Sequence, residues 1–133
     1  MEIVVEHLGD SQFEVKARSH TLICDQPLEN GGHDEGMTPP ELLLASLGTC
    51  AGYYAAQYLK HHNLAAAGTR VRVSAGKAKD PARMEDFVIS LEVAALLDDR
   101  HRAGLERAVN KCLVHATLTH PPRISLAIGP LVD

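Results

Sequence analysis

The sequence predicts an α+β domain in which an antiparallel sheet packs on one long central helix, in the order βββ-α-ββ-α-β. Three observations support this fold class. Segments that alternate apolar and polar residues, as strands do, are grouped apart from segments with helical periodicity. One proline-free stretch is long enough for a central helix. The length of 133 residues suits one hydrophobic core, so residues 1–133 are expected to form a single domain.

The N-terminal quarter is expected to be a meander of three strands. Apolar and polar residues alternate near 1–7, 12–18 and 20–25, and a turn signal separates the first two segments at Gly9-Asp10-Ser11. Residues 27–36 are rich in Gly, Asn and Asp, which favour tight turns. This stretch is therefore predicted to be a loop without a helix.

The central helix has a strong start signal. Thr38 suits the N-cap, Pro39 the first helical position, and Glu41 the third position of a capping box. No proline follows until well beyond His62, where the helix is expected to end. Apolar residues recur along one face, which places Cys50 in the middle of an inward stripe formed by Leu43, Leu47, Cys50, Tyr54 and Tyr58.

The second half predicts a hairpin, a helix and a last strand. Alternation around Val71–Val73 and over 87–93 indicates two strands joined by residues 77–83. Asp98 or Asp99 then caps a helix whose apolar side is formed by Leu105, Ala108, Val109 and Cys112. After His120-Pro121-Pro122, alternation at Ile124, Leu126 and Ile128 predicts the final strand.

Composition excludes several classes of function. A net charge of -4 argues against nucleic-acid binding, because phosphate backbones attract clustered Lys and Arg. No segment approaches the roughly 20 apolar residues of a membrane span, and the N-terminus lacks the features of a signal peptide, so a cytoplasmic location is expected. Aromatics form only 4% of the chain, which disfavours a stacked cofactor. His115 follows Cys112 at a ligand-like spacing, but no second ligand cluster accompanies it, so no metal is expected.

Cys50 and Cys112 are the candidate reactive residues, although each is also interpretable as a small buried hydrophobe. The surroundings of Cys50 favour chemistry, because small residues leave space for a substrate or a second thiol. These residues are Ser46, Gly48, Thr49, Ala51 and Gly52. Cys24 ends a predicted strand without a motif around it and is expected to be a core or edge residue.

Two motifs resemble those of the OsmC/Ohr family, the osmotically inducible protein C-like proteins. The first is Thr38-Pro39-Pro40-Glu41-Leu42, with Cys50 nine positions after Glu41, and the second is Val109-Asn110-Lys111-Cys112. The order of strands and helices also agrees over about 1–128. The chain has Leu113 where the better-characterised hydroperoxide reductases have proline, and its spacing from Glu41 to Cys50 is one residue shorter. It is therefore more similar to the less-characterised branch of the family.

The resemblance implies a thiol-dependent peroxidase that reduces organic hydroperoxides. The Cys50 thiolate would attack the hydroperoxide, Cys112 would resolve the resulting sulfenic acid as a disulfide, and an external dithiol would reduce that disulfide. In the family, an N-terminal arginine held by the motif glutamate lowers the pKa of the reactive cysteine. Glu41 matches this glutamate, although a capping-box role is an equally good interpretation. Arg18 is the only arginine before Cys50, although a solvated charge at the end of a strand is the better interpretation of this residue.

The resemblance also implies an intertwined homodimer, and Gly48 and Gly52 would allow two backbones to approach closely, although packing within one subunit would explain them too. No cofactor is expected, because oxygen transfer to sulfur needs none. The alternative function is a non-enzymatic module on the same fold that binds a small apolar ligand or senses redox state.

Overall fold

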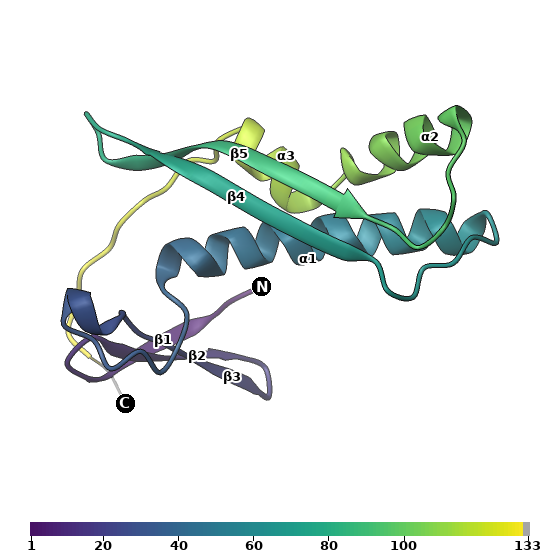
Figure 1. Ribbon diagram of the computed structural model, residues 1–133. Helices are drawn as coiled ribbons and strands as arrows, with labels where there is room; N and C mark the ends of the chain where they lie inside the picture. Colours follow the sequence, from purple (N-terminus) through teal and green to yellow (C-terminus); the bar gives the residue numbers. More distant parts are fainter. Residues whose placement is uncertain (132–133) are drawn as a thin grey trace. The chain divides into compact units, whose positions relative to one another are not determined.

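The computed structural model describes residues 1–131 (Figure 1). The chain is divided by its internal contacts into two compact units, of which the first contains residues 1–48 and 72–90 and the second residues 49–71 and 91–131. One helix and one hairpin contribute residues to both units. The mixture of helices and antiparallel strands confirms the predicted α+β class. The organisation into one domain stays a prediction.

The first unit begins with the predicted three-stranded meander (Figure 1). Its strands are β1 (Val4–Gly9), β2 (Gln12–Ala17) and β3 (His20–Cys24), which pair antiparallel in sequence order. Every residue of β1 is exposed. The β1–β2 turn has Gly9 at φ 138°, a conformation that favours glycine, which explains why the turn falls at this position.

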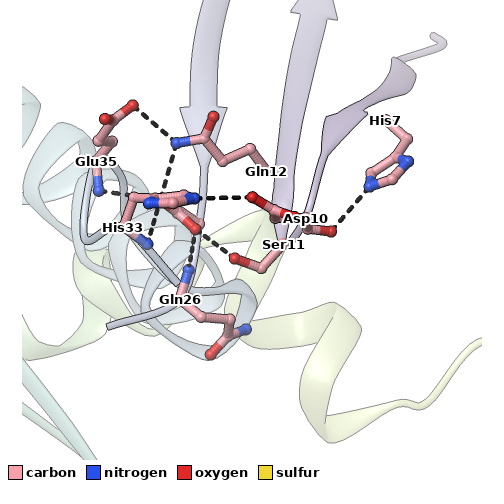
Figure 2. A network of polar contacts seen from close by, with 8 residues as sticks. His7, Asp10, Ser11, Gln12, Gln26, His33 and Glu35 are labelled. Atoms are coloured by element: carbon pink, nitrogen blue, oxygen red, sulfur yellow. Dashed lines mark hydrogen bonds and ion pairs between the residues drawn. The ribbon is translucent and has the colours of Figure 1, made fainter. Parts of the chain in front are cut away.

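A buried carboxylate joins this meander to the loop that follows it. Asp25 is fully buried and accepts five hydrogen bonds, two from side chains of the β1–β2 turn and three from backbone N–H groups of the loop. The donors are Ser11 Oγ at 2.6 Å, Gln12 Nε2 at 3.0 Å and the N–H groups of Gln26, His33 and Glu35. Figure 2 shows these donors gathered from the turn and the loop. A buried polar group normally requires such partners, and this one has them all within a single unit.

The charge of Asp25 is favoured by these donors. The Ser11 hydroxyl is the largest cause that lowers the pKa of Asp25, and Gln12 and the loop N–H groups add to it, so that together they outweigh the opposing effect of burial. Beside this carboxylate, His33 Nε2 lies 2.9 Å from the Asp10 carboxylate, which raises the pKa of His33 (Figure 2). Together with the bond from Gln12 Nε2 to Glu35 Oε2 at 2.7 Å, these contacts fix the loop to the sheet.

The loop itself contains a short element that the sequence did not predict. Residues Leu28–Asn30 form a single 3-10 turn, η1, which ends at Gly31 with φ 83°. The prediction that this loop contains no helix was therefore wrong, since it contains one 3-10 turn. A glycine in the left-handed conformation, which favours a bend, can also end such a turn. A Cβ atom at Gly32 would overlap the Gln26 carbonyl, so the chain is tightly folded back here.

Helix α1 (Pro39–His61) begins as predicted. Thr38 and Glu41 form a reciprocal capping box, in which the Thr38 N–H donates to Glu41 Oε1 at 3.0 Å and the Glu41 N–H donates to Thr38 Oγ1 at 3.4 Å. The most buried line along the helix is formed by Leu47, Ala51, Ala55 and Leu59. Cys50 is only half-buried, so its predicted place in the middle of the inward stripe was wrong. It lies beside the buried line, because helical spacing alone does not fix which edge of an apolar stripe faces the core.

The next two strands, β4 (Arg70–Ala78) and β5 (Arg83–Glu92), form the predicted hairpin, with a shorter connection than residues 77–83. Within the first unit, a Cβ atom at Gly48 would lie 3.0 Å from Val73 Cγ2. Within the second, a Cβ atom at Gly52 would lie 3.3 Å from Val71 Cγ2. The small residues of α1 thus accommodate strand β4 of the same chain.

The predicted second helix is in fact two helices. Helix α2 (Asp99–Val109) is capped by Asp98, which accepts from the His101 N–H at 2.8 Å, and helix α3 (Leu113–Thr119) starts after a turn. The prediction that Cys112 continues the apolar face of one helix was wrong, because its φ and ψ of -54° and 127° are not helical. The core of the second unit is formed by Ala55, Leu59 and Leu105.

The predicted final strand is absent, since residues 120–131 form no regular structure. Ile124, Leu126 and Ile128 are 86–91% exposed. Alternation indicates a segment suited to a sheet, but a strand also needs a neighbouring backbone for its hydrogen bonds. Within the described chain, this segment pairs with no other strand.

We expect Asp25→Asn to lower the melting temperature by about 5 °C or more, because the amide nitrogen replaces one carboxylate oxygen and turns its own N–H groups toward the two or three donors that bonded to that oxygen. Glu29→Gln, an exposed change in η1, is the matched control and should leave the melting temperature close to that of the parent. Folding lowers the pKa of Asp25, so its contribution is complete at neutral pH and is lost as pH falls below the unfolded value of about 4. Thermal unfolding followed by circular dichroism should show the difference shrinking in acid, and a constant difference would contradict the assignment.

Candidate active site

Cys50 and Cys112 are brought together in the second unit. Cys50 is on α1 and half-buried, whereas Cys112 precedes α3 and is fully buried. Each thiol shifts the pKa of the other, so the two side chains are close neighbours, and neither takes part in a disulfide. The predicted pair therefore exists as two thiols in contact, with the half-buried one more open to a reagent.

The start of α3 arranges backbone donors around both sulfur atoms. Cys112 is the N-cap residue, and its Sγ accepts the His115 N–H at 3.4 Å. The N–H groups of Val114 and Leu113 act on the Cys50 sulfur and favour its thiolate. The first N–H groups of a helix have no partner within the helix, so the two thiols satisfy donors that would otherwise be unpaired.

These contacts move the two pKa values in opposite directions. Burial opposes the thiolate of Cys50, but the Cys112 thiol and the N–H groups of Val114 and Leu113 together lower the pKa of Cys50 below its ordinary value. Burial raises the pKa of Cys112, as does Cys50, and the His115 and Val114 N–H groups only partly offset this. The site thus favours a thiolate at Cys50 and a neutral thiol at Cys112.

Glu41 and Arg18 both lie in the first unit. Glu41 is exposed and bonded to Thr38, whose backbone N–H and side chain lower the pKa of Glu41. Arg18 occupies the β2–β3 turn with φ 57° and is exposed, and it forms no hydrogen bond or ion pair with another residue in the range 1–131. The capping role of Glu41 is confirmed, whereas the predicted roles of Glu41 and Arg18 toward Cys50 stay predictions.

A second group of side chains lies where α1 ends and α2 begins. The rings of Tyr58 and His62 are in contact at an angle of 38°, with centroids 4.3 Å apart, and Tyr58 Oη lies 3.1 Å from His101 Nδ1. Burial, then the charges of His61, His101 and Arg100, lower the pKa of His62. This group was not predicted from the sequence, because the contact to His101 joins two helices that are distant in sequence.

Other kinds of site receive no support from residues 1–131. No group of three or more His, Cys, Asp or Glu side chains in this range is placed to hold a metal ion. No helix in this range has the length and apolar character needed to span a membrane. Cys24 is buried at the end of β3, as expected for a core residue.

Comparison of the sequence with family models gives a match to the OsmC-like protein family over residues 32–127. The match includes both cysteines and the whole of α1, and it extends across both units. A search of the curated proteins gives no match.

Solved structures share the fold. A candidate osmotic-stress-induced and detoxification-response protein from Psychrobacter arcticus 273-4 is 25% identical, with a TM-score of 0.79 over 86% of this chain and 85% of that one. An OsmC-like protein from Mycoplasma pneumoniae is 15% identical, with a TM-score of 0.77 over 90% and 87% of the two chains. An organic hydroperoxide resistance protein OsmC from Legionella pneumophila is 13% identical, with a TM-score of 0.64 over 88% and 87%.

We expect Cys50 to be alkylated several-fold faster than Cys112 or Cys24 at neutral pH, because alkylation requires the thiolate and Cys50 is also the most accessible of the three. Iodoacetamide labelling followed by peptide mass spectrometry measures the three rates. Cys50→Ser should remove the fast phase, and Cys24→Ser, the matched control, should retain it. Faster labelling of Cys112 would contradict the assignment.

Proposed function

Because the chain belongs to the OsmC-like protein family, we propose that it is a thiol-dependent peroxidase that reduces organic hydroperoxides through Cys50 and Cys112. The observation that carries this proposal is the contact between two free thiols whose pKa values are shifted in opposite directions. A thiol peroxidase needs this asymmetry, because one sulfur must attack as a thiolate while the other waits as a thiol. The hydroperoxide resistance named for the Legionella pneumophila protein is consistent with the same substrate class.

The first step is the attack of the Cys50 thiolate on the terminal oxygen of a hydroperoxide. The O–O bond breaks, a sulfur–oxygen bond forms, and the alkoxide leaves and takes up a proton as the alcohol. Sulfur is oxidised to the sulfenic acid while the peroxide is reduced. Cys50 suits this step because it is half-buried and its thiolate accepts two backbone N–H groups.

The second step uses the contact between the two thiols. The Cys112 sulfur displaces the hydroxyl of the sulfenic acid, so that a Cys50–Cys112 disulfide forms and water leaves. The buried Cys112 thiol already lies close enough to Cys50 to shift its pKa, which keeps the chain movement small. An external dithiol then reduces the disulfide by exchange, which returns both thiols. The cycle transfers oxygen to sulfur and uses no metal or organic cofactor.

The protein is further proposed to act as an intertwined homodimer. Two exposed apolar features support this: β1, whose residues are all exposed, and the C-terminal segment with Ile124, Leu126 and Ile128. Contiguous exposed apolar residues commonly mark a protein interface, and a segment with strand-like alternation is suited to pair with the sheet edge of a second copy. Gly48 and Gly52 do not contribute to this argument, because strand β4 of the same chain approaches them.

We expect Cys112→Ser to consume about one equivalent of cumene hydroperoxide and stop as the Cys50 sulfenic acid, because no resolving thiol remains. Cys50→Ser should consume almost none, and Cys24→Ser, the control, should turn over as the parent does with a dithiol reductant. Peroxide loss and a sulfenic-acid-selective label located by mass spectrometry provide the measurement.

Two results would change the assignment. A sulfenic acid on Cys112 in the Cys50→Ser protein would reverse the two roles. Equal peroxide loss from the parent and from the protein with both cysteines replaced would favour the alternative of a ligand-binding module with idle thiols.

We expect sedimentation equilibrium at micromolar concentration to give about twice the chain mass of 14.4 kDa. The double change Ile124→Asp and Ile128→Asp should shift the protein toward the monomer, because it places charges in the proposed contact. Leu96→Asp, at a residue of similar exposure in the β5–α2 connection, should leave the mass unchanged. A monomeric parent protein would rule out the dimer.

A further inference from the structure

His115 has an unexplained feature beside the thiol pair. Its Nδ1 atom is buried and has no hydrogen-bond partner, and among side chains of residues 1–131 it is the one buried nitrogen or oxygen without a partner. Buried polar groups are nearly always bonded, so such an exception requires an explanation. The proposed peroxidase cycle, as described above, makes no use of this side chain.

The local backbone connects His115 to the sulfur of Cys112. Cys112 is the N-cap of α3 and His115 is the third residue of that helix, and its N–H donates to Cys112 Sγ at 3.4 Å. Side chains at the N-cap and third positions are neighbours, as the reciprocal bonds of a capping box demonstrate. The helix start therefore holds the His115 imidazole in the neighbourhood of the thiol that must lose its proton during resolution.

We propose that His115 transfers the proton during disulfide formation, an inference that rests on the proposed peroxidase function. In the tautomer protonated at Nε2, Nδ1 accepts the proton of the Cys112 thiol through one water molecule or after a rotation of the imidazole, since the two are not hydrogen-bonded in the described state. The Cys112 sulfur then forms the bond to the Cys50 sulfur, and the sulfur–oxygen bond of the sulfenic acid breaks. The imidazolium gives the same proton to the departing hydroxide, which leaves as water. One thiol is oxidised, one sulfenic acid is reduced, and His115 is regenerated.

The protonated state of the Cys112 thiol is the reason why a nearby base would assist disulfide formation. Burial, together with Cys50, raises the pKa of Cys112, so at neutral pH it carries a proton that must be removed before the sulfur becomes a good nucleophile. A base within reach speeds such a step, and histidine is the commonest side chain in this role. Within residues 1–131, three titratable groups take part in this step. They are Cys50 on α1, and Cys112 and His115 at the start of α3.

The experiment separates the two chemical steps by rapid mixing of the whole reduced protein with cumene hydroperoxide. A sulfenic-acid-selective reagent follows the first step, and non-reducing mass spectrometry follows disulfide formation, both measured between about pH 5.5 and 9. His115→Asn is the informative variant, because its amide oxygen can occupy the position of Nδ1 without taking up a proton. His120→Gln is the matched control, because His120 lies at the other end of α3 and its Nδ1 is bonded to the Ala116 carbonyl.

The expected result is an unchanged first step and a second step slowed about 10²-fold at neutral pH in His115→Asn, within the usual range for loss of an acid–base group. The rate of the variant should rise with pH more steeply than that of the parent, because hydroxide then replaces the lost base. Added imidazole should restore part of the rate. The His120→Gln protein should behave as the parent in both steps.

Other outcomes have distinct meanings. Resolution at the parental rate in His115→Asn overturns the inference and leaves the proposed function intact. Slower resolution by the same factor at every pH, without rescue by imidazole, also overturns it, because a structural defect would act in that way. Failure of the parent to form any Cys50 sulfenic acid removes the proposed function itself. If His115→Asn does not fold, His115→Gln is measured in the same way and decides by the same criteria.

Discussion

The cap that the Cys112 sulfur places on α3 is the interaction on which the candidate site depends. It starts a new helix after the turn that follows Val109, and it directs the first N–H groups of that helix toward two sulfur atoms. Burial by itself would raise the pKa of both thiols and leave two inert cysteines. The Cys112 thiol and the N–H groups of Val114 and Leu113 outweigh burial at Cys50, whereas the His115 and Val114 N–H groups only partly offset it at Cys112, so the two neighbouring thiols have different chemical states.

Small residues on α1 complement this arrangement. Within each unit, a β4 valine leaves too little room for a Cβ atom at a glycine of α1, with Val73 against Gly48 and Val71 against Gly52. Larger side chains at either glycine would force that strand outward. The helix therefore packs closely on one side while Cys50, on another side, stays half-buried. A core built from Ala and Leu rather than aromatics makes this geometry possible, since the most buried line of α1 includes Ala51 and Ala55.

The elements that the sequence predicted well are those with local signals. The capping box of Thr38 and Glu41 is a contact between neighbours in the chain, and alternation with a Gly9 turn defines the meander. The break before Cys112 was missed because the spacing of Leu105, Ala108, Val109 and Cys112 is apolar and helical whether or not the helix continues. The hydrogen bonds to the buried Asp25 carboxylate were not predicted, because their donors come from segments that only the folded chain brings together. A backbone N–H group is present in almost every residue, so no residue type in the sequence indicates where it acts as a donor. The motifs therefore identified the two cysteines but not the groups that lower the pKa of Cys50.

The donors found for Cys50 also bear on the whole redox cycle. Those that favour its thiolate are neutral, namely a thiol and two peptide N–H groups, and all belong to the unit that contains Cys50. A cation close to the sulfur would favour the thiolate as well, but it would be left without a partner once the sulfur became part of a neutral disulfide. An unpaired buried charge is costly, whereas an N–H group of a helix start can turn to water or tighten its own turn. Neutral donors would therefore leave no unpaired buried charge at Cys50 in the proposed disulfide.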